Sequence, residues 1–221
     1  MLRIEDLSLN GLKIYQDDEL YCFTSDAVLL SKFAMVKHGD IVADFCSGSG
    51  IVGLHLYGLN AEKIKSVTLF EMQKSLYDLS VKSIELNNLT DKFTAVNTKL
   101  QDITSDYNEK FSLIVCNPPY MSVNGGFDAD DQSKAVCRAE KELSLSELLD
   151  AIKKHLKFGG RVAMVHRADR LVDIVSGMRE RNIEPKRLQL VSGGNKPPYL
   201  VLIEGVKGGK PSLKVLNNLE N

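Results

Sequence analysis

A corner poor in hydrogen-bond donors follows an apolar run in the sequence FSLIVCNPPY. The run Phe111–Cys116 predicts a buried strand, and it ends at Asn117, Pro118, Pro119 and Tyr120. Proline has no N–H, so the corner offers carbonyl oxygens, and the Asn117 amide adds a further acceptor. A planar amine could place its two hydrogens on the Asn117 side-chain oxygen and the Pro118 carbonyl, with its ring stacked on Tyr120. We therefore predict that these four residues are catalytic.

The chemistry that suits this corner is methyl transfer to a planar amine such as the exocyclic amine of adenine. With both hydrogens held, the nitrogen lone pair is free to attack a methyl group. The hydrogen bonds become charge-assisted as the nitrogen becomes cationic, so they are strongest in the transition state. The alternative interpretation is a strand end with a proline stop and no catalytic role.

A glycine-rich loop, DFCSGSGIVG, contains Gly48 and Gly50 and matches the dinucleotide fingerprint between a strand and a helix. About twenty residues further on, Glu71 ends the next predicted strand, where a carboxylate can accept both hydroxyls of a ribose. Asp44 precedes the loop, and its charge suits a cationic ammonium or sulfonium better than a pyrophosphate. The pattern favours S-adenosylmethionine over NAD. The alternatives are glycines that serve only a tight turn and an Asp44 that only caps the loop.

Strand and helix patterns alternate around these motifs and predict an α/β domain with a mostly parallel, doubly wound sheet and helices on both faces. The segments 186–191 and 199–206 are joined by SGGNKPP, which is too short for a helix, so they are expected to pair antiparallel. The other predicted strands are 40–45, 66–71, 92–96, 111–116 and 161–166, and the predicted helices are 51–57, 75–88 and 145–156.

The chain is expected to form one domain of residues 1–221. Residues 1–36 would hold an N-terminal hairpin, placed at 11–23 around the turn at 16–19, and a helix over 27–35. The catalytic core would span 37–208, and 209–221 would be a C-terminal tail, with its last dozen residues loose.

Composition narrows the class of protein. Hydrophobic residues make up 43% of the chain and charged residues 26%, and no apolar run approaches the roughly 18 residues of a membrane span. The N-terminus has no signal-peptide pattern, so we expect a cytoplasmic protein without membrane contact. The four cysteines match no zinc or redox spacing, which predicts free thiols and no metal site.

Charge is distributed unevenly along the chain. Residues 161–221 hold eleven Lys or Arg against six Asp or Glu, although the formal net charge of the whole chain is -1. A basic region can hold a polyanion, and the candidate substrate-binding residues are Arg167, Lys196 and Lys207. The alternative is a solvated surface with no ligand.

The segments ADFCSGSGIVG, LQD and NPPY, together with Glu71, resemble class I S-adenosylmethionine-dependent methyltransferases that methylate planar nitrogens. The flanking segments GLKIYQDDELYCFTSDAVLL and PPYLVLIEGVKGGKP resemble the bacterial tRNA1(Val) adenine-37 N(6)-methyltransferase family. This resemblance implies a seven-stranded Rossmann-like sheet with an antiparallel last strand, S-adenosylmethionine as cofactor and tRNA as partner. It implies cofactor-binding roles for Ser25, Asp26, Asp44, Gly48, Gly50, Glu71 and Asp102.

Within the resemblance, Asp44, Gly48 and Gly50 surround the methionine part of the cofactor, and Ser25 and Asp26 close over its carboxylate. The resemblance also implies that Glu71 holds the ribose and that Asp102 meets the adenine amine.

One departure from the family pattern is Cys46, which stands where relatives commonly have glycine. The alternative substrates are another planar amine, either an rRNA base or the N(5) of a release-factor glutamine. A non-catalytic adapter is a further alternative. Residues 121–142 could form a lid, and the sequence gives no basis for an oligomeric state.

Overall fold

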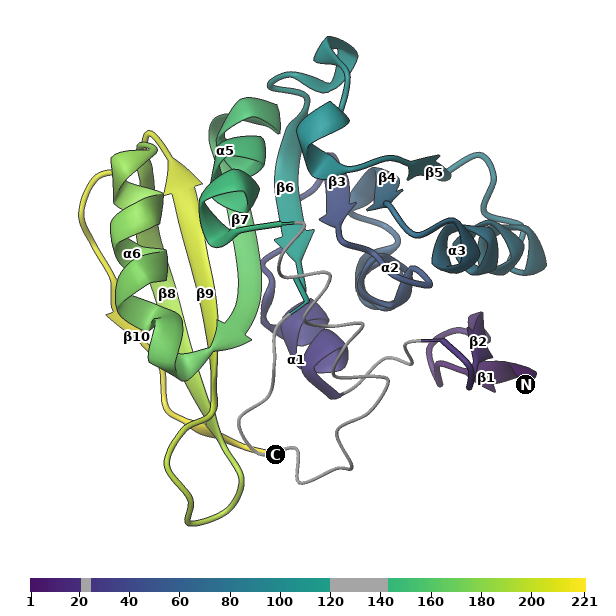
Figure 1. The fold of residues 1–221 in the computed structure, drawn as a ribbon, viewed down its shortest axis with the longest axis horizontal. Helices are drawn as coiled ribbons and strands as arrows, with labels where there is room; N and C mark the ends of the chain where they lie inside the picture. The colour runs from purple at the N-terminus through teal and green to yellow at the C-terminus, as the bar shows by residue number, and fades with distance from the viewer. Residues whose placement is uncertain (21–24, 120–142) are drawn as a thin grey trace.

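The computed structural model describes residues 1–20, 25–119 and 143–221. They form a nine-stranded sheet in the order β10-β8-β9-β7-β6-β3-β4-β5, with β11 also paired to β8, and a separate two-stranded hairpin (Figure 1). The strands are β1 (Leu2–Asp6), β2 (Lys13–Asp17), β3 (Asp40–Phe45), β4 (Ile64–Glu71), β5 (Phe93–Asn97), β6 (Phe111–Cys116), β7 (Leu156–Arg167), β8 (Ile183–Ser192), β9 (Leu200–Lys207), β10 (Lys214–Val215) and β11 (Leu219–Glu220).

Helices cover both faces of the sheet and make a three-layer domain (Figure 1). One apolar cluster joins the sheet to α1, α2 and α3, and a second cluster joins its other face to α5 and α6. The helices are α1 (Ser25–Phe33), α2 (Ile51–Asn60), α3 (Lys74–Leu86), α5 (Leu145–His155) and α6 (Leu171–Glu180), with short 3-10 turns at Leu100–Asp102, Ser105–Tyr107 and Ala168–Arg170.

The central strands follow from their composition. Every residue of β6 is buried, and its six residues are apolar apart from Ser112, as expected for a parallel strand covered on both faces. Ser112 avoids an unpaired hydroxyl by donating to Asp40 Oδ1 at 2.7 Å.

Local signals also act at helix ends, because Ser144 and Glu147 form a reciprocal capping box at the start of α5.

The predicted fold class is confirmed. Strands β3 to β7 pair parallel to one another in the core, and β9 runs antiparallel to both β7 and β8. The short β10 and β11 pair parallel to β8 and extend this seven-stranded arrangement.

Two local predictions were wrong, and one helix was missed. The N-terminal hairpin pairs β1 with β2, so its turn lies at 7–12 and not at 16–19. The C-terminal residues are not loose, because β10 and β11 pair with β8 and Leu216 N–H donates to Leu188 O at 2.8 Å. The helix α6 was not predicted, although its buried residues Ile174 and Met178 have helical spacing.

Among the described residues, no helix combines the length and the apolar character that a membrane crossing requires.

Candidate active site

The predicted motifs meet at the carboxyl edge of the parallel strands. Phe45, the last residue of β3, pairs with Phe70 on one side and with Cys116 on the other. Glu71 and Asn117 each lie one residue beyond these partners and therefore flank the start of the glycine loop. In open α/β sheets this edge is where ligands bind. The glycine loop, Glu71 and the Asn117 corner therefore lie at one edge of the sheet.

The glycine loop is tightly wound and connects β3 to α2. Gly48 and Gly50 have φ angles of 56° and 92°, in the left-handed region that glycine adopts without strain. Gly50 N–H donates to Ser47 O at 2.8 Å and closes the turn. A β-carbon on Gly53 would lie 2.6 Å from Leu69 Cδ2, so this glycine permits the close packing of α2 on β4.

Asp44 is fully buried and uses one oxygen to hold the helix that follows the loop. Its Oδ2 accepts a hydrogen bond from Gly53 N–H at 2.8 Å, which is the capping role considered for this residue. Its Oδ1 has no hydrogen-bond partner in the part of the chain that the structure describes. Burial raises the pKa of Asp44 to about 8, against the opposing effect of the Gly53 hydrogen bond. This pKa favours the protonated form of Asp44 at neutral pH when no cation lies beside it.

Glu71 connects the end of β4 to the glycine loop. Its Oε2 accepts from Gly48 N–H at 2.9 Å, and its Oε1 accepts from Gln73 N–H at 2.8 Å. Burial raises the pKa of Glu71, and these backbone hydrogen bonds act in the opposite direction. Each carboxylate oxygen has a second lone pair, so acceptor capacity for ribose hydroxyls remains.

The proline corner lies directly beyond β6. Pro118 is buried, while Asn117 and Pro119 are partly exposed, so the Asn117 side chain is accessible from the edge. Tyr120, the fourth predicted catalytic residue, and the proposed lid of residues 121–142 lie outside the described residues.

Two cofactor-binding predictions concern residues at the margins of this edge. Asp102 ends the 3-10 turn that follows β5, and it is exposed. Ser25 begins α1 and lies at the carboxyl edge, near the end of β8. Asn221 connects the two: its backbone N–H donates to Ser192 O at 3.0 Å, and its side-chain amide donates to Ser25 Oγ at 2.8 Å. Asp26 belongs to the first turn of the same helix.

The three candidate basic residues do not lie together. Arg167 ends β7 at the carboxyl edge and pairs with Asp169. Lys196 is exposed in the loop between β8 and β9, at the same edge. Lys207 ends the antiparallel β9 and pairs in register with Ile183, at the start of β8, so it lies at the opposite edge of the sheet.

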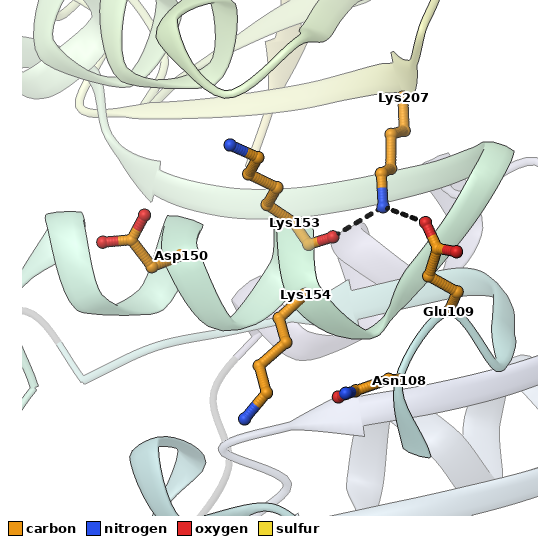
Figure 2. Close-up of a pocket in the computed structure, with 6 residues that line it drawn as sticks. All are labelled: Asn108, Glu109, Asp150, Lys153, Lys154 and Lys207. Carbon is orange, nitrogen blue, oxygen red and sulfur yellow. Dashed lines mark hydrogen bonds and ion pairs between the residues drawn. The ribbon is translucent and has the colours of Figure 1, made fainter. Parts of the chain in front are cut away.

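Lys207 has a structural role where it lies. Its ammonium donates to Glu109 Oε1 at 2.9 Å and to the carbonyls of Lys153 and Leu156 at 2.8 Å, at the end of α5 (Figure 2). These contacts line a surface hollow of about 440 Å³ that is remote from the motifs. The geometry gives no support to Lys207 as a substrate-binding residue.

Two of the four cysteines, Cys46 and Cys116, belong to the described residues. Cys46 and Cys116 are free thiols, as predicted, and the other two cysteines lie outside the described residues. Cys46 has a φ angle of 58°, so the residue that replaces the usual glycine keeps a left-handed backbone. The neighbouring Cys46 thiol contributes, after burial, to raising the pKa of Cys116.

Two polar residues of this edge were not predicted to have a role. Ser47 Oγ is buried in the glycine loop and has no hydrogen-bond partner within residues 1–20, 25–119 and 143–221, and Gln16 from the hairpin contacts Ser49 in the same loop. Ser47 lies within the recognised motif, so its position was a usable signal. Gln16 is distant in sequence, and only the folded arrangement shows its contact.

The fold is a Rossmann-like α/β domain whose carboxyl edge brings together a glycine loop, an acidic strand end and a proline corner. The chain belongs to the methyltransferase small domain family (MTS), whose sequence profile matches residues 23–175.

Curated proteins are similar to this chain at modest identity. The chain is 28% identical over 158 residues to a tRNA1(Val) (adenine(37)-N6)-methyltransferase of Shewanella baltica, in an alignment that covers 69% of this chain and 64% of the relative. It is 27% identical over 186 residues to the protein of the same name from Parabacteroides distasonis, covering 81% of this chain and 74% of that one. The chain thus spans less than two thirds of the Shewanella protein.

Solved structures with the same fold are more distant in sequence. A predicted O-methyltransferase from Agrobacterium tumefaciens superposes with a TM-score of 0.68 at 17% identity, covering 88% of this chain and 86% of that chain. TYW2 of M. jannaschii, solved in complex with AdoMet, gives a TM-score of 0.65 at 12% identity, covering 92% of this chain and 84% of that chain. At these identities the likeness shows the fold alone.

Proposed function

We propose that this protein transfers a methyl group from S-adenosylmethionine to the exocyclic N(6) of an adenine in tRNA. The observation that carries the proposal is the convergence of the Asp44 loop, Glu71 and the Asn117 corner on one edge of the sheet. Membership of the methyltransferase small domain family and the names of the curated relatives support it. A tRNA substrate would place the reaction in the cytoplasm.

The residues of the edge fit the cofactor. Two buried oxygens, Asp44 Oδ1 and Ser47 Oγ, have no hydrogen-bond partner among the described residues and can receive donors from the amino-acid part of the cofactor. Apart from its chain neighbours, no atom of the described residues lies within 4 Å of the position that a β-carbon on Gly48 would take, which leaves room for a ligand there. Glu71 would hold the ribose, Asp102 the adenine amine, and Ser25 and Asp26 the carboxylate end.

When bound, S-adenosylmethionine would supply an activated methyl group on its sulfonium. The chain's contribution is to orient the target amine through the Asn117 side-chain oxygen and the Pro118 carbonyl. Asn117 suits this role because it is accessible and because no hydrogen bond occupies its side chain within the described part of the chain. Both contacts strengthen as positive charge develops on nitrogen, which lowers the barrier without requiring a strong base.

The nucleic-acid part of the proposal rests on Arg167 and Lys196, which lie at the same edge as the corner. Basic side chains there can contact phosphates that flank a target base. An rRNA base or a release-factor glutamine presents a planar amine of the same kind, so these remain the competing substrates.

The test is to incubate the protein with labelled S-adenosylmethionine and, separately, tRNA, rRNA or release factor, and then to digest the labelled product. The proposal predicts label in N(6)-methyladenosine from tRNA. Label in a modified guanosine or in glutamine would identify a competing substrate, and no label in any product would contradict the proposed activity.

A further inference from the structure

The N-terminal hairpin reaches the glycine loop through one side chain. Gln16, in β2, is 1% exposed, and its Nε2 donates to Ser49 Oγ at 2.5 Å and to the Tyr15 carbonyl at 3.1 Å. Ser49 is 3% exposed and lies between Gly48 and Gly50. The contact therefore connects the middle of the glycine loop to a segment 33 residues earlier in the chain.

The hairpin is firmly attached to α3, which makes Gln16 a fixed point. The Asn87 side chain accepts from Lys13 N–H at 2.8 Å and donates to Lys13 O at 2.6 Å. Tyr15 N–H donates to Ser83 Oγ at 3.0 Å, and Ile14 is fully buried in the apolar cluster. The residues immediately before Gln16 are thus anchored to the domain on three successive positions.

The glycine loop has particular need of such an anchor. Glycine has a wide range of backbone conformations, so fixing the segment around Gly48 and Gly50 costs conformational entropy. Glu71 holds the loop at Gly48 N–H, and the Ser47 carbonyl closes the turn at Gly50 N–H. The hydrogen bond from Gln16 holds the side chain of Ser49, which lies between Gly48 and Gly50.

We propose that Gln16 is a positioning residue for the cofactor: by holding Ser49 it keeps the glycine loop in its binding conformation, so the N-terminal hairpin is part of the cofactor site. This inference rests on the proposed function of the loop. It predicts an effect on cofactor affinity and not on the transfer step, because Gln16 acts through Ser49.

The test is a double-mutant cycle read by calorimetric binding of S-adenosylhomocysteine, the demethylated product. Gln16→Ala and Ser49→Ala should each weaken binding about tenfold, because each removes the same buried hydrogen bond. The double variant should bind about as well as either single variant, since the contact can be lost only once. The single-turnover rate of Gln16→Ala at saturating cofactor should stay within about twofold of that of the unmodified protein.

Two matched variants separate positioning from general stability. Gln16→Glu keeps an acceptor that the Ser49 hydroxyl can donate to, so it should recover most of the lost affinity. Lys207→Ala removes hydrogen bonds to carbonyls at the end of α5, at the opposite edge of the sheet from the glycine loop, and should lower the melting temperature without changing cofactor affinity.

The outcomes distinguish this inference from the proposed function. If the unmodified protein does not bind S-adenosylhomocysteine, the proposed cofactor is wrong. If it binds, and Gln16→Ala binds equally well or the two alanine effects simply add, the inference about Gln16 is overturned. Should Gln16→Ala fail to fold, Ser49→Ala and Gln16→Glu provide the same comparison.

Discussion

Asp44 and Gly53 join the first core strand to the helix after the glycine loop: the Asp44 Oδ2 accepts the Gly53 N–H at 2.8 Å in a fully buried position. One carboxylate oxygen is thus committed to structure, while Oδ1 has no partner. The cost of burying this group is visible in its pKa of about 8. Because of this pKa, cofactor affinity and the stability of the ligand-free protein should depend on pH in opposite directions.

Cofactor affinity should rise with pH in the neutral range. Below a pKa of about 8, Asp44 is mostly protonated, and a cationic ligand favours its charged form, so binding should release a proton. We expect affinity to increase by up to about tenfold for each pH unit from 6 to 8 and to level off above. Calorimetry in buffers of different ionisation enthalpy would measure the released proton, and binding without proton release at pH 6.5 would contradict this assignment.

The stability of the ligand-free protein should change in the opposite direction. The folded pKa of Asp44 lies above its ordinary value of 3.8, so the native state binds more protons than the unfolded chain between these values. The contribution of Asp44 to stability is therefore lost as the pH rises from about 4 to about 8. Asp44→Asn should flatten this dependence and raise the free energy of unfolding at pH 8, as measured by urea titration. A steeper dependence in the variant would refute it.

His155 should make the protein less stable in mild acid. Its side chain is fully buried and packs edge-on against Phe45, with the two ring centroids 6.3 Å apart. Burial lowers the pKa of His155 below its ordinary value of 6.5. The backbone of Tyr107 acts in the opposite direction on this pKa, but neither ring nitrogen has a partner in hydrogen-bond geometry.

The unfolded chain binds a proton at His155 more readily than the folded protein does. The contribution of His155 to stability is therefore present above pH 6.5 and is lost as the pH falls below it. Urea unfolding of His155→Leu should show a smaller loss of stability between pH 7 and 5 than the unmodified protein. Equal losses in the two proteins would contradict the prediction.

Cys46 should be a strained position. Its φ of 58° is unfavourable for a residue with a β-carbon, by roughly 1 kcal/mol relative to glycine. We expect Cys46→Gly to have a higher free energy of unfolding than Cys46→Ala by about that amount, because both variants lose the thiol and only alanine keeps the β-carbon. Urea unfolding of the two variants measures the difference, and a more stable alanine variant would show that strain is not the dominant effect.

Lys196 and Lys207 form a matched pair for locating the RNA surface. Lys196→Glu, at the edge that carries Asn117, should weaken tRNA binding and reduce its dependence on salt concentration. Lys207→Glu places the same charge change at the opposite edge, so it should lower the melting temperature through its lost contacts with the end of α5 and leave tRNA binding unchanged. Equal losses of binding in both variants would contradict this placement.

The core of the fold was predictable because its signals are local. Apolar runs such as Phe111–Cys116 define buried strands, and the position of Asn117 and Glu71 at strand ends follows from the chain order of parallel strands. The same reasoning placed the glycine loop at the edge. These features depend on periodicity and on strand direction, and both can be read from the sequence.

The features that could not be predicted from the sequence depend on contacts between segments that are far apart along the chain. The register of β1 with β2 is fixed by attachment to α3, which no local pattern near residues 11–23 shows. The last residues include Leu216 and Leu219, which pack against the apolar cluster, and they are held by the pairing of β10 and β11 with β8. Lys207 looked like a substrate contact by its charge, but the antiparallel direction of β9 carries it to the other edge.

The central claim is that Asn117 holds the target amine during methyl transfer. The most direct test is the single-turnover rate of Asn117→Ala at saturating S-adenosylmethionine and tRNA. The account predicts a rate about 10²- to 10³-fold below that of the unmodified protein, as expected when one preorganised hydrogen-bonding group is removed, with cofactor affinity unchanged. A variant that transfers methyl groups at a near-normal rate would contradict the account.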